Sequence, residues 1–298
     1  MKKGSKTSSF GTTARISHDS APYYNSKLYT ELPGEAESLP VPDNPFPPQL
    51  ENTLLLGSAE NMQAIPDNSL HLMVTSPPYN VTKEYDQDLS LREYLQLLRS
   101  VFAETYRVLV YGGRACVNVA NLGRKPYIPL SDYVSQIMIK LGFLMRGEIV
   151  WYKGAGAGVS MAWGSWQSAS NPVLRDTHEY ILVFSKGAFA RKKSAGKEDT
   201  ITREQFMEWT RSVWKMNPES AKKVGHPAPF PIELPYRLVQ LYTYKGEVVL
   251  DPFMGSGTTA IAALKSERKY VGYEIEPEYI RLAEQRLAPF KLQMSLGI

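Results

Sequence analysis

The tetrapeptide Ser76-Pro77-Pro78-Tyr79 has residue types that could hold the exocyclic amino group of a nucleic-acid base. Each proline fixes its own φ and keeps the residue before it out of the α region, so this segment is rigid and extended. The Ser76 hydroxyl and the Pro77 carbonyl are acceptors that can bind the two amine hydrogens and turn the nitrogen lone pair toward an electrophile. Tyr79 can stack on the base, a contact worth ~1–3 kcal/mol, and this offsets the cost of flipping the base out of a duplex. The alternative is a strand that simply ends in a proline turn.

A second candidate site begins at Asp251, where the sequence reads Asp-Pro-Phe-Met-Gly-Ser-Gly-Thr-Thr. Gly255 and Gly257 let the backbone turn sharply and approach a ligand, and the N-terminus of the helix expected next favours negative charge. Glu274 ends the following strand, where its carboxylate can accept both hydroxyls of a ribose. No Gly-Lys-Ser/Thr follows, so the segment is not a phosphate-binding Walker loop. The sequence therefore predicts a nucleotide-like cofactor here, and the alternative is an ordinary tight turn.

Alternating strands and helices are expected to position both loops. Short apolar runs predict strands over 53–56, 70–75, 115–119, 149–152, 180–184, 247–250 and 270–275. Apolar residues at helical spacing predict helices over 91–109, 133–141, 233–244, 258–265 and from Pro277 onward. Gly112-Gly113 are expected to end the first of these helices. The alternation implies an α/β fold, with a mainly parallel sheet and helices on both faces.

The composition is that of a globular, mildly basic chain of 298 residues. Hydrophobic residues make up 43% and charged residues 21%, which excludes a disordered or fibrous protein. A single cysteine excludes an internal disulfide and a cysteine-built zinc site. We find no secretory signal pattern and no apolar run of the ~18 residues that a membrane span needs. These features predict a cytoplasmic protein.

The net charge of +4 is concentrated in two basic segments. Residues 1–30 hold five Lys and Arg against one Asp, and residues 187–223 hold nine Lys and Arg against five Asp and Glu. The rest of the chain is therefore acidic. Six prolines between residues 31 and 49 indicate an extended strap. The basic segments are compatible with a polyanionic partner, and the alternative is that they are solvated surface.

The two candidate loops together resemble those of the amino-methylating DNA methyltransferases that use S-adenosylmethionine. Ser76–Tyr79 lies far upstream of Asp251–Thr259, as in the permuted β-group, whose catalytic half precedes its cofactor half. The resemblance implies a Rossmann-like methyltransferase fold with a mainly parallel seven-stranded sheet and a reversed hairpin near the target side. It divides the chain into a basic arm and Pro-rich strap (1–49), a catalytic half (50–186), a basic insert that is the candidate target-recognition segment (187–223), and a cofactor-binding half (224–298).

The resemblance also implies which residues bind S-adenosylmethionine. The candidates are Ser58, His226, Phe230, Asp251, Phe253, Gly255, Gly257, Thr258 and Glu274. Phe253 and Gly255 would line the cofactor, Glu274 would hold its ribose, and Thr258 would bind its methionine carboxylate. The segment from His226 to Pro231 is similar to the one that closes over the methionine.

The resemblance also implies specific roles for Asp251 and Ser58. Asp251 would orient the cofactor or its loop rather than act as a base. Gly57-Ser58 stands where relatives usually have Gly-Asp, whose Asp reaches the cofactor adenine, so Ser58 would be a weaker substitute.

The first residue of the tetrapeptide bears on the target base. Serine at this position resembles the cytosine-N4 subgroup, whereas Asp or Asn there is more typical of adenine-N6 enzymes, and methylation of adenine N6 remains the alternative.

Other classes of enzyme fit the sequence less well. Methylation of cytosine C5 needs a nucleophilic cysteine, and Cys116 lies within an apolar run that predicts a buried structural thiol. RNA or protein-glutamine methyltransferases use a similar Pro-Pro-Tyr grip but usually place the cofactor loop upstream. A non-catalytic nucleotide- or DNA-binding module would not need both loops.

The expected reaction is direct methyl transfer to a flipped base in double-stranded DNA, without a metal, by a site-specific enzyme of the restriction-modification type. The candidate DNA-binding residues are Arg191, Lys192, Lys193, Lys197 and Arg203. Trp163 and Trp166, in the loop 154–172, either share in target recognition or belong to a half-buried core. Because β-group relatives often form homodimers, the resemblance also implies that two copies can associate, and DNA binding implies association with the nucleoid.

Overall fold

The computed structural model describes residues 27–29, 34, 42–78, 89–123, 125–154, 164–219 and 230–296. The chain divides into two compact units, residues 1–34 and 35–298. In the first unit the described part includes the 3-10 turn Lys27–Tyr29. The second unit contains the sheet, and its packed body begins before residue 50, because the Asn44 N–H donates to the Asn68 carbonyl at 2.8 Å.

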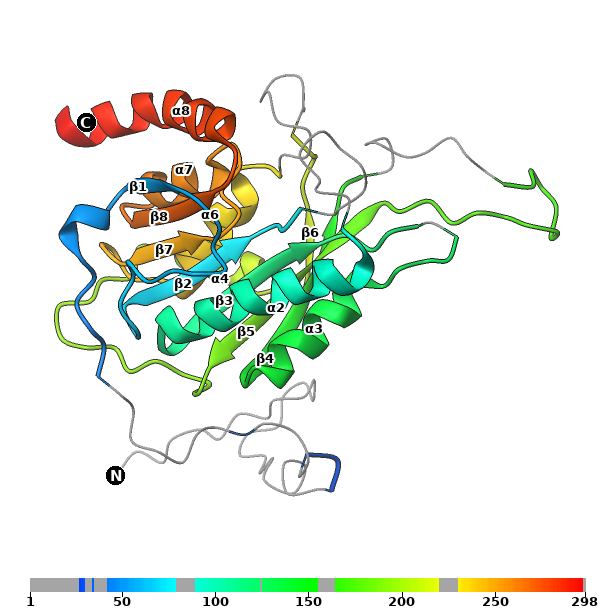
Figure 1. Ribbon diagram of the computed structural model, residues 1–298, viewed down its shortest axis with the longest axis horizontal. Helices are drawn as coiled ribbons and strands as arrows, with labels where there is room; N and C mark the ends of the chain where they lie inside the picture. The colour runs from blue at the N-terminus through cyan, green and yellow to red at the C-terminus, as the bar shows by residue number, and fades with distance from the viewer. Residues whose placement is uncertain are drawn as a thin grey trace. The chain divides into compact units, whose positions relative to one another are not determined.

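Within the described residues, one eight-stranded sheet runs in the order β1-β8-β7-β2-β3-β5-β4-β6 (Figure 1). Its strands are β1 (Thr53–Leu56), β2 (Leu70–Thr75), β3 (Leu109–Val119), β4 (Phe143–Tyr152), β5 (His178–Lys186), β6 (Val213–Lys215), β7 (Val248–Asp251) and β8 (Lys269–Glu274). β5 is antiparallel to both of its neighbours, β3 and β4, and all other pairs are parallel. The expected α/β class and the reversed hairpin are confirmed. The expected number of seven strands was wrong, because the short β6 adds an eighth strand beside β4.

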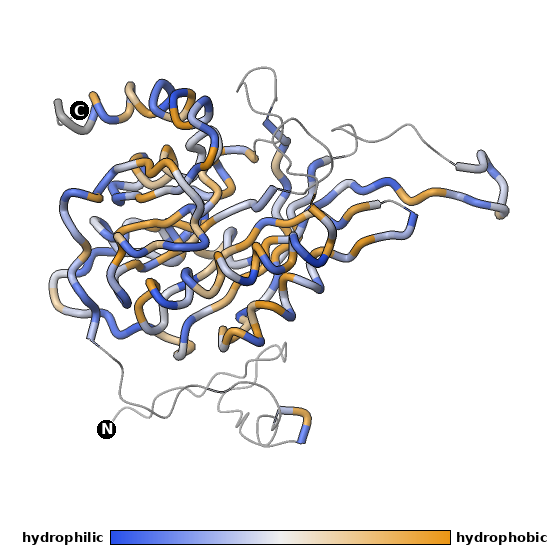
Figure 2. The backbone as a smooth tube through the Cα atoms, in the orientation of Figure 1, coloured by the Kyte–Doolittle hydropathy of each residue, from blue (hydrophilic) through white to orange (hydrophobic). Residues whose placement is uncertain are grey.

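Helices cover both faces of this sheet (Figure 1). α2 (Leu91–Val108) and α3 (Leu130–Lys140) pack on one face, and α6 (Glu233–Tyr242) and α7 (Thr258–Lys265) pack on the other, where α4 (Arg203–Trp209) and α8 (Pro277–Leu296) join them. Side chains of β2 alternate between the two cores: Met73 packs on the side of α2, and Leu72 and Val74 pack on the side of α6. The central strands are accordingly hydrophobic along much of their length in Figure 2. No helix in the described part of the chain is both long and apolar enough to cross a membrane.

The connection between α2 and β3 differs from the prediction. α2 begins with the expected kind of signal, a capping box in which the Glu93 N–H donates to the Ser90 hydroxyl at 3.3 Å. It ends at Val108, however, and Gly112-Gly113 lie inside β3. Gly112 has φ +72°, and a Cβ on Gly113 would lie 2.8 Å from a backbone carbonyl oxygen. The two glycines therefore permit an irregularity in the strand rather than end the helix, consistent with the shift in β2–β3 register nearby.

The strand directions decide where the candidate loops emerge. All strands except β5 run the same way, so their C-terminal ends share one edge of the sheet, which we call the carboxyl edge, and their starts share the amino edge. β5 begins at the carboxyl edge with His178 and Glu179 and ends at the amino edge with Lys186. β2 and β7 are neighbours, with Met73 opposite Leu250. Both candidate loops therefore leave adjacent strands at the carboxyl edge, as ligand sites of open α/β sheets do.

Candidate active site

The last residues of β2 and β7 join the two candidate loops directly. The Thr75 hydroxyl donates a hydrogen bond of 2.6 Å to Asp251 Oδ1, across 176 residues of sequence. Both side chains are buried. Ser76, Pro77 and Pro78 follow Thr75 at once, with Pro77 buried and the other two half-buried, while Tyr79 lies outside the described residues. The sheet thus brings the Ser76 loop and the glycine loop together, as one site requires.

Asp251 organises the start of the glycine loop. Its carboxylate also accepts hydrogen bonds from the Thr259 hydroxyl at 2.7 Å and from the Phe253 N–H at 3.1 Å. Burial raises the pKa of Asp251 to about 6, although these hydrogen bonds and the one from Thr75 favour the ionised form. The carboxylate of Asp251 is thus occupied by three donors of the protein itself: Thr75, Phe253 and Thr259. Asp251 is therefore suited to hold the two loops together rather than to accept a proton from a substrate.

This raised pKa predicts a specific pH dependence of stability. A carboxyl whose pKa is higher in the folded than in the unfolded state stabilises the fold fully below pH 4, and this contribution is lost as the pH rises through about 6. We expect the free energy of unfolding of the wild type, minus that of Asp251→Asn, to fall by at most about 3 kcal/mol between pH 4 and pH 7. Urea unfolding of both proteins across this range measures it. A difference that does not change with pH would contradict the assignment.

The glycine loop and Glu274 form the second part of the site. Gly255 and Gly257 have φ of +51° and +80°, and Gly257 directly precedes α7. The Gly255 N–H donates to Glu274 Oε2 at 2.8 Å, and the Glu276 N–H donates to Oε1 at 3.0 Å. Burial raises the pKa of Glu274. β8 thus presents a carboxylate beside a left-handed glycine turn and a helix N-terminus, a donor and acceptor set that fits the ribose and the carboxylate of a nucleoside-linked amino acid.

Other predicted cofactor residues lie around this turn. Thr258 is buried at the first position of α7, and Phe253 is half-buried against the core on the α2 side. Ser58 is exposed and its hydroxyl donates to Glu60 Oε2 at 3.2 Å, but the adjoining Gly57 N–H donates to the Glu274 carbonyl at 2.9 Å. Ser58 therefore belongs to the same edge. Phe230 packs against the core on the α6 side, and His226 lies outside the described residues.

Sequence reasoning missed Arg286, which α8 brings to the glycine loop. Its guanidinium donates to the Ser256 hydroxyl at 2.7 Å, to the Thr258 hydroxyl at 3.2 Å and to the Ser256 carbonyl. Burial lowers the pKa of Arg286. One arginine on an amphipathic helix has no distinguishing pattern, so nothing in the sequence could have singled it out.

Three polar residues that are connected to Ser76 were also missed: Asn118, Glu179 and Lys153. Asn118, near the end of β3, donates from Nδ2 to Ser76 Oγ at 3.4 Å and to Glu179 Oε2 at 2.6 Å. Glu179, at the start of β5, forms an ion pair with Lys153, which directly follows β4. Asn118 and Glu179 are 2% and 8% exposed. A buried polar network thus reaches Ser76 from the reversed hairpin.

The structure does not bring the predicted DNA-binding residues together with Ser76. Arg191 and Lys197 lie at the amino edge, where both bind the buried Glu247, at 2.7 and 3.0 Å. Lys193 pairs with Asp199 at 2.5 Å. Lys192, between Arg191 and Lys193, is exposed, as is Arg203 at the start of α4. Since β5 ends at the amino edge, the insert that follows it starts on the side away from the candidate site.

This placement predicts that Arg191 acts on stability. Its side chain is 15% exposed and that of Glu247 is 2% exposed. We expect Arg191→Ala to lower the free energy of unfolding by about 1–3 kcal/mol, because a buried carboxylate loses its closest cationic partner. Chemical denaturation measures this. Lys193→Ala, which breaks an exposed pair on the same segment, is the control and should leave stability nearly unchanged. Equal stability of Arg191→Ala and the wild type, with weaker DNA binding, would instead support the prediction that Arg191 contacts DNA.

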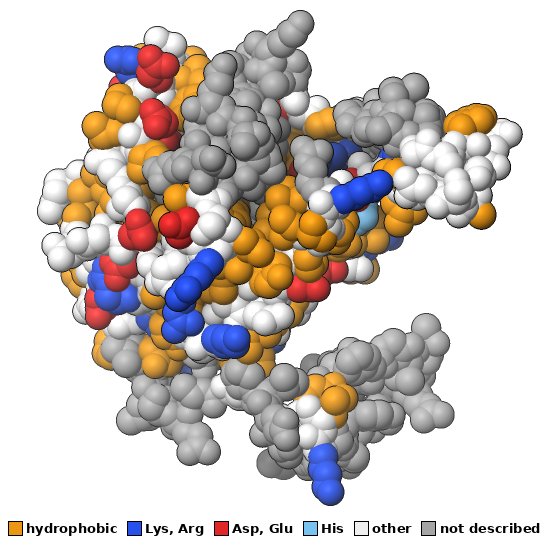
Figure 3. Space-filling model, turned by 45° about the vertical axis from the view of Figure 1, so that its right-hand side comes forward, with side chains coloured by type: hydrophobic (Ala, Val, Ile, Leu, Met, Phe, Trp, Pro, Cys, Tyr) orange, Lys and Arg blue, Asp and Glu red, His pale blue; other side chains and the backbone are white. Residues whose placement is uncertain are grey.

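The segment between β4 and β5 extends from the carboxyl edge as an arm, which we define as residues 164–177. Its tip is closed by hydrogen bonds between Ser165 and Asn171, at 2.8 and 2.9 Å. The arm projects at the right of Figures 1 and 3, and its tip carries hydrophobic and uncharged polar side chains. Trp166 is 64% exposed and Leu174 is 93% exposed. The interpretation of Trp166 as half-buried core was therefore wrong, and Trp163 lies outside the described residues.

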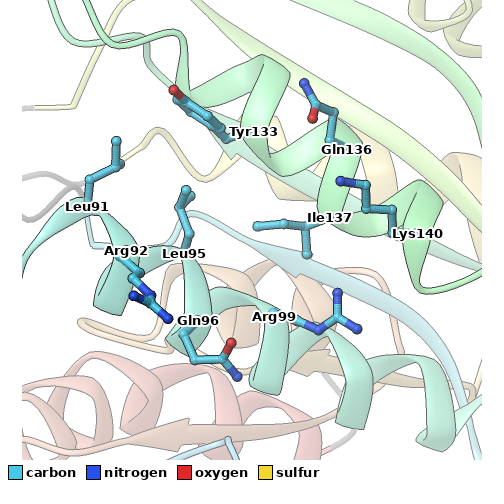
Figure 4. Close-up of a pocket in the computed structure, with 9 residues that line it drawn as sticks. All are labelled: Leu91, Arg92, Leu95, Gln96, Arg99, Tyr133, Gln136, Ile137 and Lys140. Atoms are coloured by element: carbon cyan, nitrogen blue, oxygen red, sulfur yellow. The ribbon is translucent and has the colours of Figure 1, made fainter.

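Two other features lie apart from the candidate site. Cys116 is fully buried in β3, and burial raises the pKa of its thiol, as expected of a structural cysteine. A groove between α2 and α3 has an apolar floor that includes Leu95 and Ile137 and a basic rim that includes Arg99 and Lys140 (Figure 4). None of the predicted site residues lines this groove.

Comparison with known proteins agrees with this architecture. A model of the N6/N4 DNA methylase family matches residues 70–285. The type II methyltransferase M.MjaI of Methanocaldococcus jannaschii is 30% identical in an alignment 277 positions long that covers 78% of this chain and 90% of the relative. The type II methyltransferase M.BglII of Bacillus subtilis is 30% identical in an alignment 290 positions long that covers 89% of this chain and 77% of the relative.

Solved structures agree as well. The protein TTHA0409 of Thermus thermophilus, in complex with S-adenosyl-L-methionine, superimposes with a TM-score of 0.64 at 31% identity, over 80% of this chain and 95% of its own. The PvuII DNA methyltransferase, which is cytosine-N4-specific, gives a TM-score of 0.64 at 19% identity, over 83% and 94% of the two chains, and shows similarity of fold alone. With the matched family model and the paired loops, these findings show that the chain belongs to the N6/N4 DNA methylase family.

Proposed function

We propose that this DNA methylase transfers the methyl group of S-adenosylmethionine to the exocyclic N4 of cytosine in duplex DNA. The observation that carries the proposal is the hydrogen bond between Thr75 and Asp251, which joins a loop suited to hold an amine to a loop suited to hold a nucleoside cofactor. Neither loop alone would require the other. Their junction supports a reaction in which both ligands meet at the carboxyl edge.

The residues of this edge fit S-adenosylmethionine. Glu274 offers a carboxylate for the two ribose hydroxyls, and Thr258 at the N-terminus of α7 offers a hydroxyl and a favourable field for the methionine carboxylate. Arg286, bound to the same loop, adds a positive charge near that carboxylate. When bound, the cofactor supplies a methyl group on a sulfonium, an electrophile that needs no metal.

The Ser76 loop promotes the reaction by orienting the target amine. The Ser76 hydroxyl and the Pro77 carbonyl accept the two hydrogens of the flipped base's amine, so that its lone pair points at the methyl carbon. The nitrogen lone pair forms the new N–C bond while the C–S bond breaks and its electrons pass to sulfur. The methylated nitrogen, now positively charged, loses a proton to water. This sequence requires no strong general base.

The choice of cytosine rests on Ser76. With serine at its first position, the tetrapeptide resembles that of the cytosine-N4 subgroup. Methylation of adenine N6 by the same mechanism is the alternative to methylation of cytosine N4. The order of the two loops, with the catalytic loop first, argues against an RNA or protein-glutamine methyltransferase.

Transfer of a labelled methyl group tests the substrate class. The purified chain is incubated with labelled S-adenosylmethionine and duplex DNA, and in parallel with RNA of the same sequence and with total protein. We expect label in DNA alone. Label only in RNA or in protein would contradict the proposal.

We further propose that DNA lies along the carboxyl edge and contacts the arm. The arm leaves β4 and β5 at the point where Lys153 and Glu179 connect to Ser76, and its exposed residues include Trp166 and Arg175. An exposed aromatic ring and a cation on an arm that projects from the carboxyl edge suit a nucleic-acid surface. In this proposal, the basic insert (residues 187–223) contacts DNA only through residues that reach the carboxyl edge.

The salt dependence of DNA binding separates these two surfaces. Arg175→Ala should reduce the slope of log K against log salt by about 0.9, the effect of one lost phosphate contact. Lys192→Ala removes another exposed cation, from the amino edge, and should leave the slope unchanged. Binding titrations at four salt concentrations measure both. The opposite pattern would assign DNA contact to the insert.

A further inference from the structure

The buried network that reaches Ser76 has a defined hydrogen-bond direction. A carboxylate is an acceptor only, so the 2.6 Å contact with Glu179 fixes the Asn118 amide with its NH2 toward Glu179. The same NH2 then donates to Ser76 Oγ at 3.4 Å. Lys153, in an ion pair with Glu179, holds that carboxylate in place from the end of β4. The direction of donation therefore runs from Asn118 to Ser76, not the reverse.

The cost of this arrangement indicates that it serves the site. Asn118 Oδ1 is buried and has no hydrogen-bond partner among the described residues. A buried acceptor without a partner destabilises a fold, and an apolar side chain of similar shape would avoid that loss. Asn118 is on β3 beside β2, the strand that Ser76 directly follows, and Glu179 is on β5 on the other side of β3. Three adjacent strands thus position one hydroxyl oxygen.

We infer that Asn118 is a positioning residue for Ser76, held by Glu179 and Lys153, which fixes the Ser76 hydroxyl in the rotamer that receives the base amine. This inference rests on the proposed function and adds the group that orients its acceptor. A serine side chain otherwise populates several staggered rotamers, and only one places Oγ where the amine hydrogen arrives.

A double-mutant cycle tests the inference. Single-turnover methyl transfer to DNA is measured for the wild type, Asn118→Ala, Ser76→Ala and the double variant. We expect Asn118→Ala to slow transfer about 10- to 100-fold, with the dissociation constants for S-adenosylmethionine and DNA unchanged. Because Asn118 acts through Ser76, the double variant should be no slower than Ser76→Ala alone. Independent, multiplicative effects would overturn the inference, as would a wild-type rate for Asn118→Ala.

Two further variants keep the result interpretable. Asn118→Leu is close in size to asparagine but cannot donate, and it should slow transfer as much as Asn118→Ala even if the alanine variant folds poorly. Val117→Ala, a truncation at the neighbouring buried position on β3, is the matched control. Its effect should multiply with that of Ser76→Ala. If the wild type itself places no methyl group on DNA, the proposed function fails, an outcome distinct from a wild-type rate in the Asn118 variants.

Discussion

Replacing Ser76 by alanine is expected to slow methyl transfer about 100- to 1,000-fold, while the dissociation constant for S-adenosylmethionine stays the same. The hydroxyl is one of two acceptors that orient the target amine, and its benefit appears only when that amine reacts. The hydrogen bond that joins the two loops comes from Thr75 to Asp251, so this substitution leaves it in place. Single-turnover rates and equilibrium binding of the cofactor measure the two effects separately.

Ser185→Ala is the matched control for this variant. Ser185, unlike Ser76, lies within the central sheet, and it is fully buried on β5, with no hydrogen-bond partner for its hydroxyl among the described residues. We expect the control to transfer methyl groups at the wild-type rate. If Ser76→Ala instead lost cofactor binding and kept its transfer rate at saturation, the roles of the two loops would be assigned wrongly.

Replacing Gly255 by valine should abolish cofactor binding, with a rise in the dissociation constant of about 100-fold or more. Its φ of +51° is in the left-handed region, where a β-branched side chain costs about 1–3 kcal/mol. The loop would relieve this strain by moving, and the Gly255 N–H would then leave Glu274, the proposed ribose acceptor. Calorimetric titration with S-adenosylmethionine measures the loss.

Gly246→Val separates backbone strain from position. Gly246 has φ +79° and nothing within 4 Å of a Cβ, and it lies just before β7, at the amino edge. The same substitution therefore imposes a similar strain away from the site. We expect this variant to lose stability and to bind the cofactor normally. Equal loss of binding in both variants would mean that general destabilisation, not the loop, explains the effect.

The sequence predicted the two loops because their chemistry is local. Ser76-Pro77-Pro78 and Gly255 follow apolar runs, and proline and glycine dictate backbone conformation wherever they stand. The prediction that Gly112-Gly113 end a helix was wrong because a glycine pair can either end a helix or permit a bulge in a strand. Only the pairing of β3 with β2 determines which of the two occurs. β6 escaped prediction because three residues are too few for a periodic pattern.

The residues that support the site could not be predicted in this way. Asn118 and Glu179 are 61 residues apart in sequence and meet only because β5 reverses direction beside β3. Arg286 reaches the glycine loop from a helix whose exposed side also carries charges. A count of charges along the sequence also does not show which cations are paired within the fold. Arg191 counts as one of nine cations in its segment, but a buried carboxylate at the opposite edge of the sheet holds it.

The central claim is that the paired loops methylate the exocyclic N4 of cytosine in DNA, and nucleoside mass spectrometry tests it most directly. Duplex DNA treated with the wild-type protein and S-adenosylmethionine is digested to nucleosides, with DNA treated with Ser76→Ala as the control. We predict N4-methylcytosine in the first sample and at most a trace in the second. N6-methyladenine in its place would contradict the assignment of the base, and 5-methylcytosine would contradict amine methylation itself.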